Sequence, residues 1–172
     1  MSSARRSDAN DSSGSQEGSG PAREYHRGVE AEKDSAAAVE RVIERYNDAW
    51  NRHDVDAIVA MHAPDMVFEN HTAGERVEGE AVREHVAAIF GNWPDLRFRT
   101  RRLYAREGLV VCEWTATATH TRTIQRNGLV AEPTGARLEW EGIDVFPIED
   151  GLIKRKDVYS DSTAILRQVG LL

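Results

Sequence analysis

Cysteine and long apolar runs are scarce in this sequence. Cys112 is the single cysteine among 172 residues, which excludes a disulfide framework within the chain. No stretch approaches the roughly 18 apolar residues of a membrane-spanning helix. Arg5 and Arg6 resemble the start of a twin-arginine signal, but no apolar segment follows them. We therefore expect a soluble, cytoplasmic protein with no membrane partner.

Basic residues are in the minority. The chain has 29 Asp and Glu against 22 Lys and Arg, a formal net charge of −7. Neutralising the phosphates of a nucleic acid requires a basic surface, so we expect no nucleic-acid partner. The six histidines show no close metal-ligand spacing, and no glycine-rich phosphate loop is present. The sequence therefore predicts neither a metal nor a cofactor.

Large aliphatic residues are nearly absent from the first 28 positions, which are rich in Ser, Gly, Asp and Arg. Such a segment cannot bury enough surface to offset the entropy lost on ordering, so we expect residues 1–28 to form a disordered tail. The remaining chain, over 35–172, has the length and apolar content of a single domain.

The order of the expected elements predicts an α+β fold. Apolar residues at helical spacing indicate three helices in the N-terminal half, and alternating patterns indicate a strand after the second helix and a meander of four strands after the third. The helices are expected from residue 34 or 35 to 51, from 54 to before Pro64, and from 80 to 90; the strands at 66–71, 96–105, 109–121, 137–148 and 152–160. A long loop is expected over 122–135, and a short amphipathic segment over 163–169.

Polar side chains enter the apolar register of these strands at a few positions. Asp144 lies in the apolar register of its strand, and a carboxylate there must be paired, hydrogen-bonded or protonated. Asn70 shares a register with Phe68, and His120 ends the apolar register that includes Trp114. Convergent polar groups on an apolar face are typical of a small-molecule pocket.

The candidate site combines these groups with two aromatic residues, one from the first helix and one from the strand of Asp144. Tyr46, from the apolar face of the first helix, and Trp140 are expected to face the same pocket. Purely structural roles remain open: Tyr46 as a core aromatic, His120 as a solvated strand end, and Asp144 in a buried structural hydrogen bond.

At these positions the sequence resembles ketosteroid isomerases and, more closely, the SnoaL-like polyketide cyclases and ester cyclases of the nuclear transport factor two-like superfamily, which also includes limonene epoxide hydrolase. The resemblance lies in residues 54–61 (DVDAIVAM), 68–74 (FENHTAG), 133–135 (PTG), 149–153 (EDGLI) and 166–170 (LRQVG). It implies a cone-shaped barrel in which a strongly curved, mainly antiparallel sheet wraps around the three N-terminal helices.

The resemblance also implies roles for individual residues. Tyr46 matches the oxyanion-hole tyrosine of the isomerases, and Asp144 matches their protonated aspartic acid. Asn70 stands where the isomerases have an aspartate base, and Gly135 stands near the base of the cyclases, so both of those carboxylates are missing. His120 lies near the histidine that assists the cyclase base.

Two hypotheses follow. The first is a cofactor-independent enzyme that transfers protons through an enolate of a hydrophobic, carbonyl-bearing polyketide or terpenoid. Asp144, His120 and Tyr46 would be catalytic, with a neutral Asp144 donating to the oxyanion, and Asn70, Phe68, Trp114 and Trp140 would contact substrate. The alternative is a non-catalytic binding or accessory domain. In either case the outer register of the strand over 109–121, which includes Val111 and Thr115, predicts a homodimer.

Overall fold

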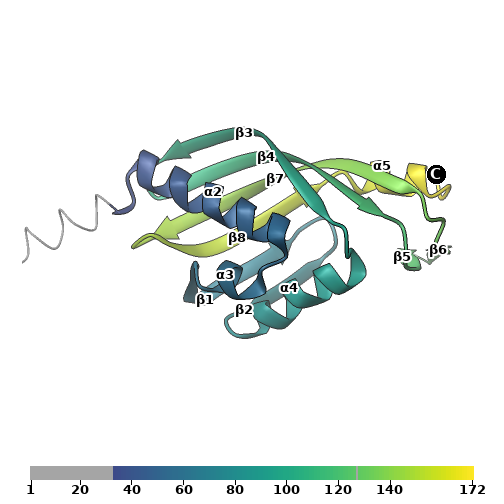
Figure 1. Ribbon diagram of the computed structural model, residues 1–172, viewed down its shortest axis with the longest axis horizontal. Coiled ribbons are helices and arrows are strands. Elements are labelled where there is room, and N and C mark those ends of the chain that lie inside the picture. Colours follow the sequence, from purple (N-terminus) through teal and green to yellow (C-terminus); the bar gives the residue numbers. More distant parts are fainter. Residues whose placement is uncertain (1–32, 127) are drawn as a thin grey trace, which may run out of the picture.

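A computed structural model describes residues 33–126 and 128–172 (Figure 1). The tail predicted over residues 1–28 lies outside the described residues. Within them, three helices in the N-terminal half and a large curved sheet form a mixed α+β fold, which confirms the predicted class. The assignment of one domain to residues 35–172 stays a prediction.

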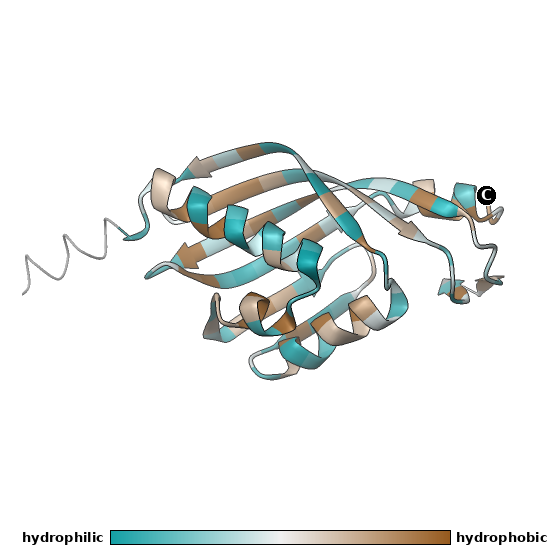
Figure 2. Cartoon of the chain, in the orientation of Figure 1, coloured by the Kyte–Doolittle hydropathy of each residue, from teal (hydrophilic) through white to brown (hydrophobic). Residues whose placement is uncertain are grey.

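The first described helix, α2 (Ala36–Arg52), packs an apolar face against the sheet. Its N-cap is Ser35, whose hydroxyl accepts a hydrogen bond from the Ala38 amide. Asp34, the other expected cap, instead accepts from the amides of Asp150 and Gly151 in the turn between the strands β7 (Arg137–Glu149) and β8 (Leu152–Ser160). In Figure 2 the hydrophilic side of α2 faces away from the sheet. The buried face consists of Val39, Val42, Ile43, Tyr46, Ala49 and Trp50.

The next elements are α3 (Val55–Val59), β1 (His62–Asn70), β2 (Glu75–Glu78) and α4 (Ala81–Asn92). Strand β1 begins earlier than expected and runs through Pro64. A proline is tolerated there because the pairing with β8 is irregular between His62 and Val67. Strand β2 was not predicted, since its mostly exposed residues lack an apolar alternation.

The remaining strands of the main sheet are β3 (Arg97–Arg106), β4 (Leu109–Thr119), β7 (Arg137–Glu149) and β8 (Leu152–Ser160). The strand order is β2-β1-β8-β7-β4-β3, and the β1–β8 pair is parallel while the other pairs are antiparallel. The predicted long loop contains a two-stranded hairpin, β5 (Ile124–Arg126) and β6 (Leu129–Ala131), and the chain closes with α5 (Ser162–Gln168).

The long strands β4 and β7 alternate between a buried and a more exposed face, as the sequence pattern predicts. Leu138, Trp140, Asp144 and Phe146 of β7 all lie on the buried face. Burial of a large apolar side chain contributes about 1.5–3 kcal/mol, so this face and α2 together hold the domain core. The same face carries the polar groups of the candidate site.

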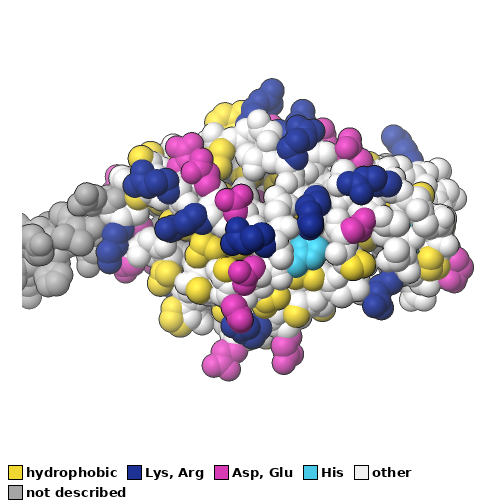
Figure 3. Space-filling view, in the orientation of Figure 1, with side chains coloured by type: hydrophobic (Ala, Val, Ile, Leu, Met, Phe, Trp, Pro, Cys, Tyr) yellow, Lys and Arg dark blue, Asp and Glu magenta, His cyan; other side chains and the backbone are white. Residues whose placement is uncertain are grey.

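The molecular surface is mixed in charge. On the face seen in Figure 3, basic and acidic side chains are interspersed rather than gathered by sign. Two arginines of β3 are ion-paired across the sheet, Arg101 with Glu141 and Arg102 with Glu113. None of the described helices is long and apolar enough to span a membrane.

Candidate functional site

A cavity of about 520 Å³ opens between the buried face of the sheet, the end of α2, α4 and the segment before β5. This volume falls in the range of roughly 300–1,000 Å³ that is common for small-molecule sites. Six aromatic rings line it, from Trp50, Phe68, Trp93, Phe98, Trp114 and Trp140, together with polar side chains such as Asn70, Glu75 and Gln125. The cavity therefore offers both apolar and polar surface to a ligand of moderate size.

A buried ion pair forms part of this wall. Lys156 on β8 donates a hydrogen bond to Oδ2 of Asp144 on β7, and both residues line the cavity. Asp144 is 4% exposed and Lys156 6% exposed. The second carboxylate oxygen, Oδ1, is buried and has no hydrogen-bond partner among the described residues. An acceptor without a partner among the described residues thus lies buried in the wall, on the side chain that accepts from Lys156.

The ion pair corrects one expectation from the sequence. We expected a neutral Asp144 that donates a hydrogen bond, but the Lys156 ammonium donates a hydrogen bond to Asp144 instead. Asp144 therefore accepts from Lys156 and is suited to act as a base rather than as a hydrogen-bond donor.

Sequence reasoning missed Lys156. In β8, Ile153 and Val158 are both buried, which an unbroken alternation would not allow, since their positions differ by an odd number. The β7–β8 register shifts between Val145 and Ile148, and this irregularity brings Lys156 to the inner face with Val158. The run Lys154, Arg155, Lys156 looks like a solvated surface, and only the shift in register reveals that its last member is buried.

Aromatic rings surround the Lys156 ammonium. Its Nζ lies 4.8 Å from the centre of the Phe146 ring, 5.4 Å from Trp50, 5.7 Å from Tyr46 and 5.9 Å from Phe68. Each such cation–π contact contributes about 0.5–2 kcal/mol, more when water is excluded. The rings and Asp144 together stabilise a positive charge at this point of the wall.

Tyr46 is fully buried behind this pair. Its hydroxyl forms a 2.9 Å hydrogen bond with Nε2 of His62 and does not reach Asp144. Burial raises the pKa of Tyr46 well above its usual range. Burial, followed by the charge of Lys156, lowers the pKa of His62 to about 4. Both partners are therefore neutral near pH 7, and Tyr46 is not among the described residues that line the cavity.

His120 is likewise buried away from the cavity lining within the described chain. Its Nδ1 lies 3.1 Å from the Thr134 hydroxyl, and its backbone amide and carbonyl bond to Ala136 and Gly135. These contacts tie the end of β4 to the segment that leads into β7. The prediction that Tyr46 and His120 share one cavity with Asp144 is therefore wrong in its geometry.

The four predicted contact residues, Asn70, Phe68, Trp114 and Trp140, all line the cavity. Asn70 uses its side-chain oxygen to accept from the Ala73 amide in the turn after β1. His85 of α4, which sequence reasoning also missed, lines the same cavity, with its ring centre 4.8 Å from that of Phe68. A histidine on an amphipathic surface helix carries no distinctive sequence signal.

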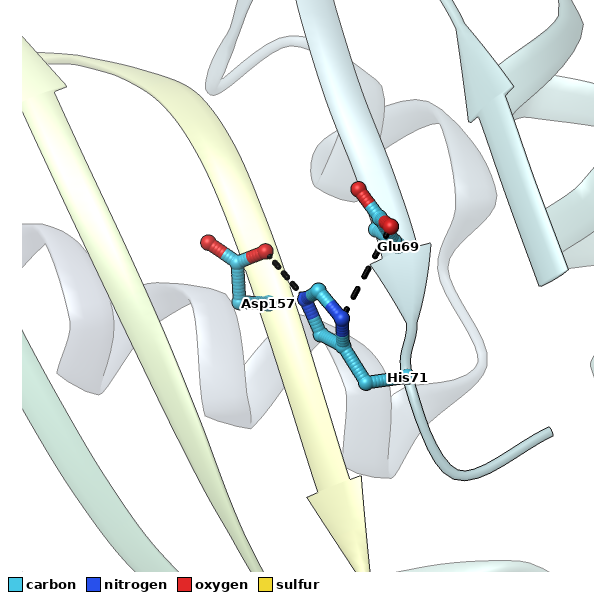
Figure 4. Close-up of side chains that lie close together, drawn as sticks. All are labelled: Glu69, His71 and Asp157. Atoms are coloured by element: carbon cyan, nitrogen blue, oxygen red, sulfur yellow. Dashed lines mark hydrogen bonds and ion pairs between the residues drawn. The ribbon is translucent and has the colours of Figure 1, made fainter. Parts of the chain in front are cut away.

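Glu69, His71 and Asp157 form a second polar cluster on the opposite face of β1 and β8 (Figure 4). Their potential ligand atoms lie within 4.8 Å of one another, a spacing that could hold a metal ion. Arg155 already binds both carboxylates, and His71 lies 2.7 Å from Asp157. A cation would have to displace the guanidinium group, so the cluster is best described as an ion-pair network.

A curved sheet and the helices packed against it, with an aromatic-lined cavity between them, define a class of small pocket domains. Residues 43–156 match the SnoaL-like domain family, and the chain belongs to that family. Comparison with curated protein sequences gives no match.

Solved structures share the fold. The structure of AclR, a proposed hydroxylase from Streptomyces galilaeus, is 25% identical with a TM-score of 0.68, and the match covers 80% of this chain and 88% of that one. IdmH, a proposed polyketide cyclase from Streptomyces antibioticus, is 24% identical over 77% of this chain and 98% of that one, with a TM-score of 0.65. A proposed SnoaL-like polyketide cyclase from Jannaschia sp. CCS1 is 18% identical with a TM-score of 0.67. The match covers 78% of this chain and 92% of that one.

Proposed function

We propose that this protein is a cofactor-independent enzyme that moves protons through an enolate of a hydrophobic, carbonyl-bearing small molecule, in a cyclisation or isomerisation of a polyketide or terpenoid. The observation that carries the proposal is the Asp144–Lys156 pair in the wall of an aromatic cavity. Relatives of the same fold that are described as proposed polyketide cyclases support the substrate class.

The pair provides complementary groups for a carbonyl compound. The substrate oxygen would accept a hydrogen bond from the Lys156 ammonium, and the adjacent C–H would point at the carboxylate of Asp144, which lines the cavity. Removal of that proton places negative charge on the oxygen, next to a fixed positive charge in a site of low polarity. Asp144 is then the general base, and Lys156 stabilises the enolate.

The proposal replaces the roles first assigned to His120 and Tyr46. Neither residue is among the described residues of the cavity lining, so neither contacts substrate in this arrangement. Tyr46 packs beneath the Lys156 ammonium, and His120 holds the segment after β4. Asn70, Phe68, Trp114 and Trp140 keep their proposed role as substrate contacts.

Proton exchange with solvent tests the chemistry without knowledge of the natural substrate. The apolar ketone 2-tetralone, incubated with the protein in D₂O, should exchange its acidic α-protons faster than in buffer, as followed by NMR. Asp144→Asn removes the base and should lower the enzymatic exchange rate by about 100-fold or more. Asp65→Asn is the matched control, because Asp65 is exposed and pairs with Lys154 outside the cavity lining.

Two results would contradict the proposal. If Asp144→Asn exchanged protons as fast as the unaltered protein, Asp144 would not be the base. If the ketone raised the melting temperature, as a bound ligand does, yet no exchange occurred, the protein would be the non-catalytic binding domain that the sequence left open.

We further propose a homodimer formed through the outer face of the sheet, and a cytoplasmic location. Arginine side chains cover part of the outward-facing register of β4. Arg99 donates a hydrogen bond to the hydroxyl of Thr115, and Arg137 donates one to that of Thr117. Exposed apolar side chains lie instead on β7 and β8. Ile143 on β7 is 41% exposed and Tyr159 on β8 is 48% exposed, and the two residues are register partners.

A charge placed on that face should separate the subunits. Ile143→Arg is expected to convert a dimer to a monomer at micromolar concentration, as measured by light scattering, because an unpaired charge in an apolar interface is costly. The control is Leu129→Arg on the β5–β6 hairpin, where Leu129 is similarly exposed at 40%. A monomeric mass for the unaltered protein, or a dimer that tolerates Ile143→Arg, would refute this assembly.

A further inference from the structure

We propose that Lys156 is a nucleophile that forms a Schiff base with the carbonyl carbon of the substrate, so that the intermediate is an enamine held covalently in the cavity. This inference rests on the proposed function and specifies the chemistry of the same site. The cationic residue in the cavity wall is a lysine, and lysine is rare in this chain.

Arginine supplies nineteen of the 22 basic residues of this chain; the lysines are Lys33, Lys154 and Lys156. An arginine carries its positive charge permanently and does not serve as an amine nucleophile. A lysine placed in an apolar pocket can lose its proton and attack a carbonyl group. Lys156 is one of the described residues that line the cavity, whereas Lys33 and Lys154 are not.

The structure provides a path for the proton that must leave first. The Lys156 ammonium donates directly to Asp144, so the carboxylate can accept this proton along an existing hydrogen bond. The nitrogen lone pair then bonds to the carbonyl carbon while the C=O π bond breaks, and a proton moves from nitrogen to the oxygen. Asp144 returns its proton to the resulting hydroxyl, which leaves as water as the C=N bond forms. The net reaction joins ammonium and carbonyl into an iminium and one water, with no oxidant or reductant.

The surroundings suit both ends of this reaction. The ammonium and the iminium carry the same positive charge, so the four rings around Nζ that stabilise the first also stabilise the second. The iminium makes the neighbouring C–H more acidic than a carbonyl does, and the regenerated Asp144 carboxylate lies beside it. One carboxylate thereby serves both the condensation and the proton abstraction.

Reductive trapping tests the inference with a simple probe. The full-length protein is incubated with 2-naphthaldehyde and sodium cyanoborohydride, which reduces an iminium to a stable amine but spares the free aldehyde, and the adduct is located by peptide fragmentation. We expect Lys156 to be labelled about tenfold or more above Lys154, because Lys156 lines the cavity that would bind the apolar aldehyde next to it, whereas Lys154 does not. Lys154 is a close internal control, since it also pairs with an aspartate, Asp65, which raises the pKa of Lys154 at the surface.

Variants complete the test. Lys156→Arg keeps the charge and should abolish the Lys156 adduct, whereas Lys154→Arg should leave it intact. Mapping on the unaltered protein keeps the test decisive if Lys156→Arg does not fold. Equal labelling of Lys154 and Lys156 would overturn the inference, and so would the absence of an adduct in a protein that still catalyses α-proton exchange of 2-tetralone. The last result would contradict the Schiff base but not the proposed function. A rate of α-proton exchange that does not depend on Asp144 would contradict the proposed function itself.

Discussion

Replacement of Asp144 by leucine is expected to destabilise the protein by about 3–5 kcal/mol, because it leaves the Lys156 ammonium buried without its partner. Lys156→Met is expected to cost a similar amount by leaving the Asp144 carboxylate alone in the wall. Both side chains are nearly inaccessible to water, so solvent cannot replace the lost partner. Urea denaturation at neutral pH measures the free energy of unfolding of each variant.

The double variant Asp144→Leu with Lys156→Met tests whether the ion pair serves the stability of the fold or the chemistry of the site. It removes both charges and fills the space with apolar side chains, so most of the stability lost in the single variants should return. Activity should not return, because both reactive groups are gone. Single variants that lose less than about 1 kcal/mol would contradict the buried ion pair, since that cost is typical of exposed pairs.

Replacement of Gly142 by alanine should also be strongly destabilising. Gly142 lies opposite Trp114 in the β4–β7 pair. A Cβ atom at this position would lie 2.3 Å from two carbon atoms of the Trp114 ring and 2.8 Å from the backbone oxygen of Tyr159. The Trp114 side chain therefore occupies the space that any larger residue would need.

We expect Gly142→Ala to lower the free energy of unfolding by about 1–3 kcal/mol or more, the usual cost of overpacking a dense core. The Trp114 ring would have to move, and because it lines the cavity, the affinity for an apolar ligand should change as well. Gly91→Ala in α4 is the matched control. Nothing lies within 4 Å of its added Cβ, so the better helix propensity of alanine should stabilise the protein by about 0.5–1 kcal/mol.

A loss of stability in both glycine variants would argue against a specific contact with Trp114. A neutral Gly142→Ala would show that the ring adapts at little cost. In the remaining case, in which only Gly142→Ala is destabilising, Gly142 determines the shape of the cavity wall through the position it allows Trp114 to adopt.

The fold class could be derived from the sequence because it depends on local periodicity. The helical spacing of the residues from Val39 to Trp50 and the alternation in Val110 to Ala118, broken at the buried Thr115, each report which face is buried. Burial of apolar surface decides those faces, and the residues that register arguments assigned to one face all line one cavity: Asn70, Phe68, Trp114, Trp140 and Asp144. They failed for Tyr46 and His120, which share the buried face but lie behind or beyond the cavity wall.

The partner of Asp144 was decided by the tertiary structure. Lys156 reaches the inner face because the β7–β8 register shifts next to it, and a local alternation pattern cannot contain that information. The hydrogen-bonding role of Asp144 followed from this neighbour, so the aspartate that was expected to be a donor is instead an acceptor. Periodicity within one strand therefore determined which residues are buried, whereas pairing between strands determined which buried groups meet, because contacts between distant segments depend on register and curvature.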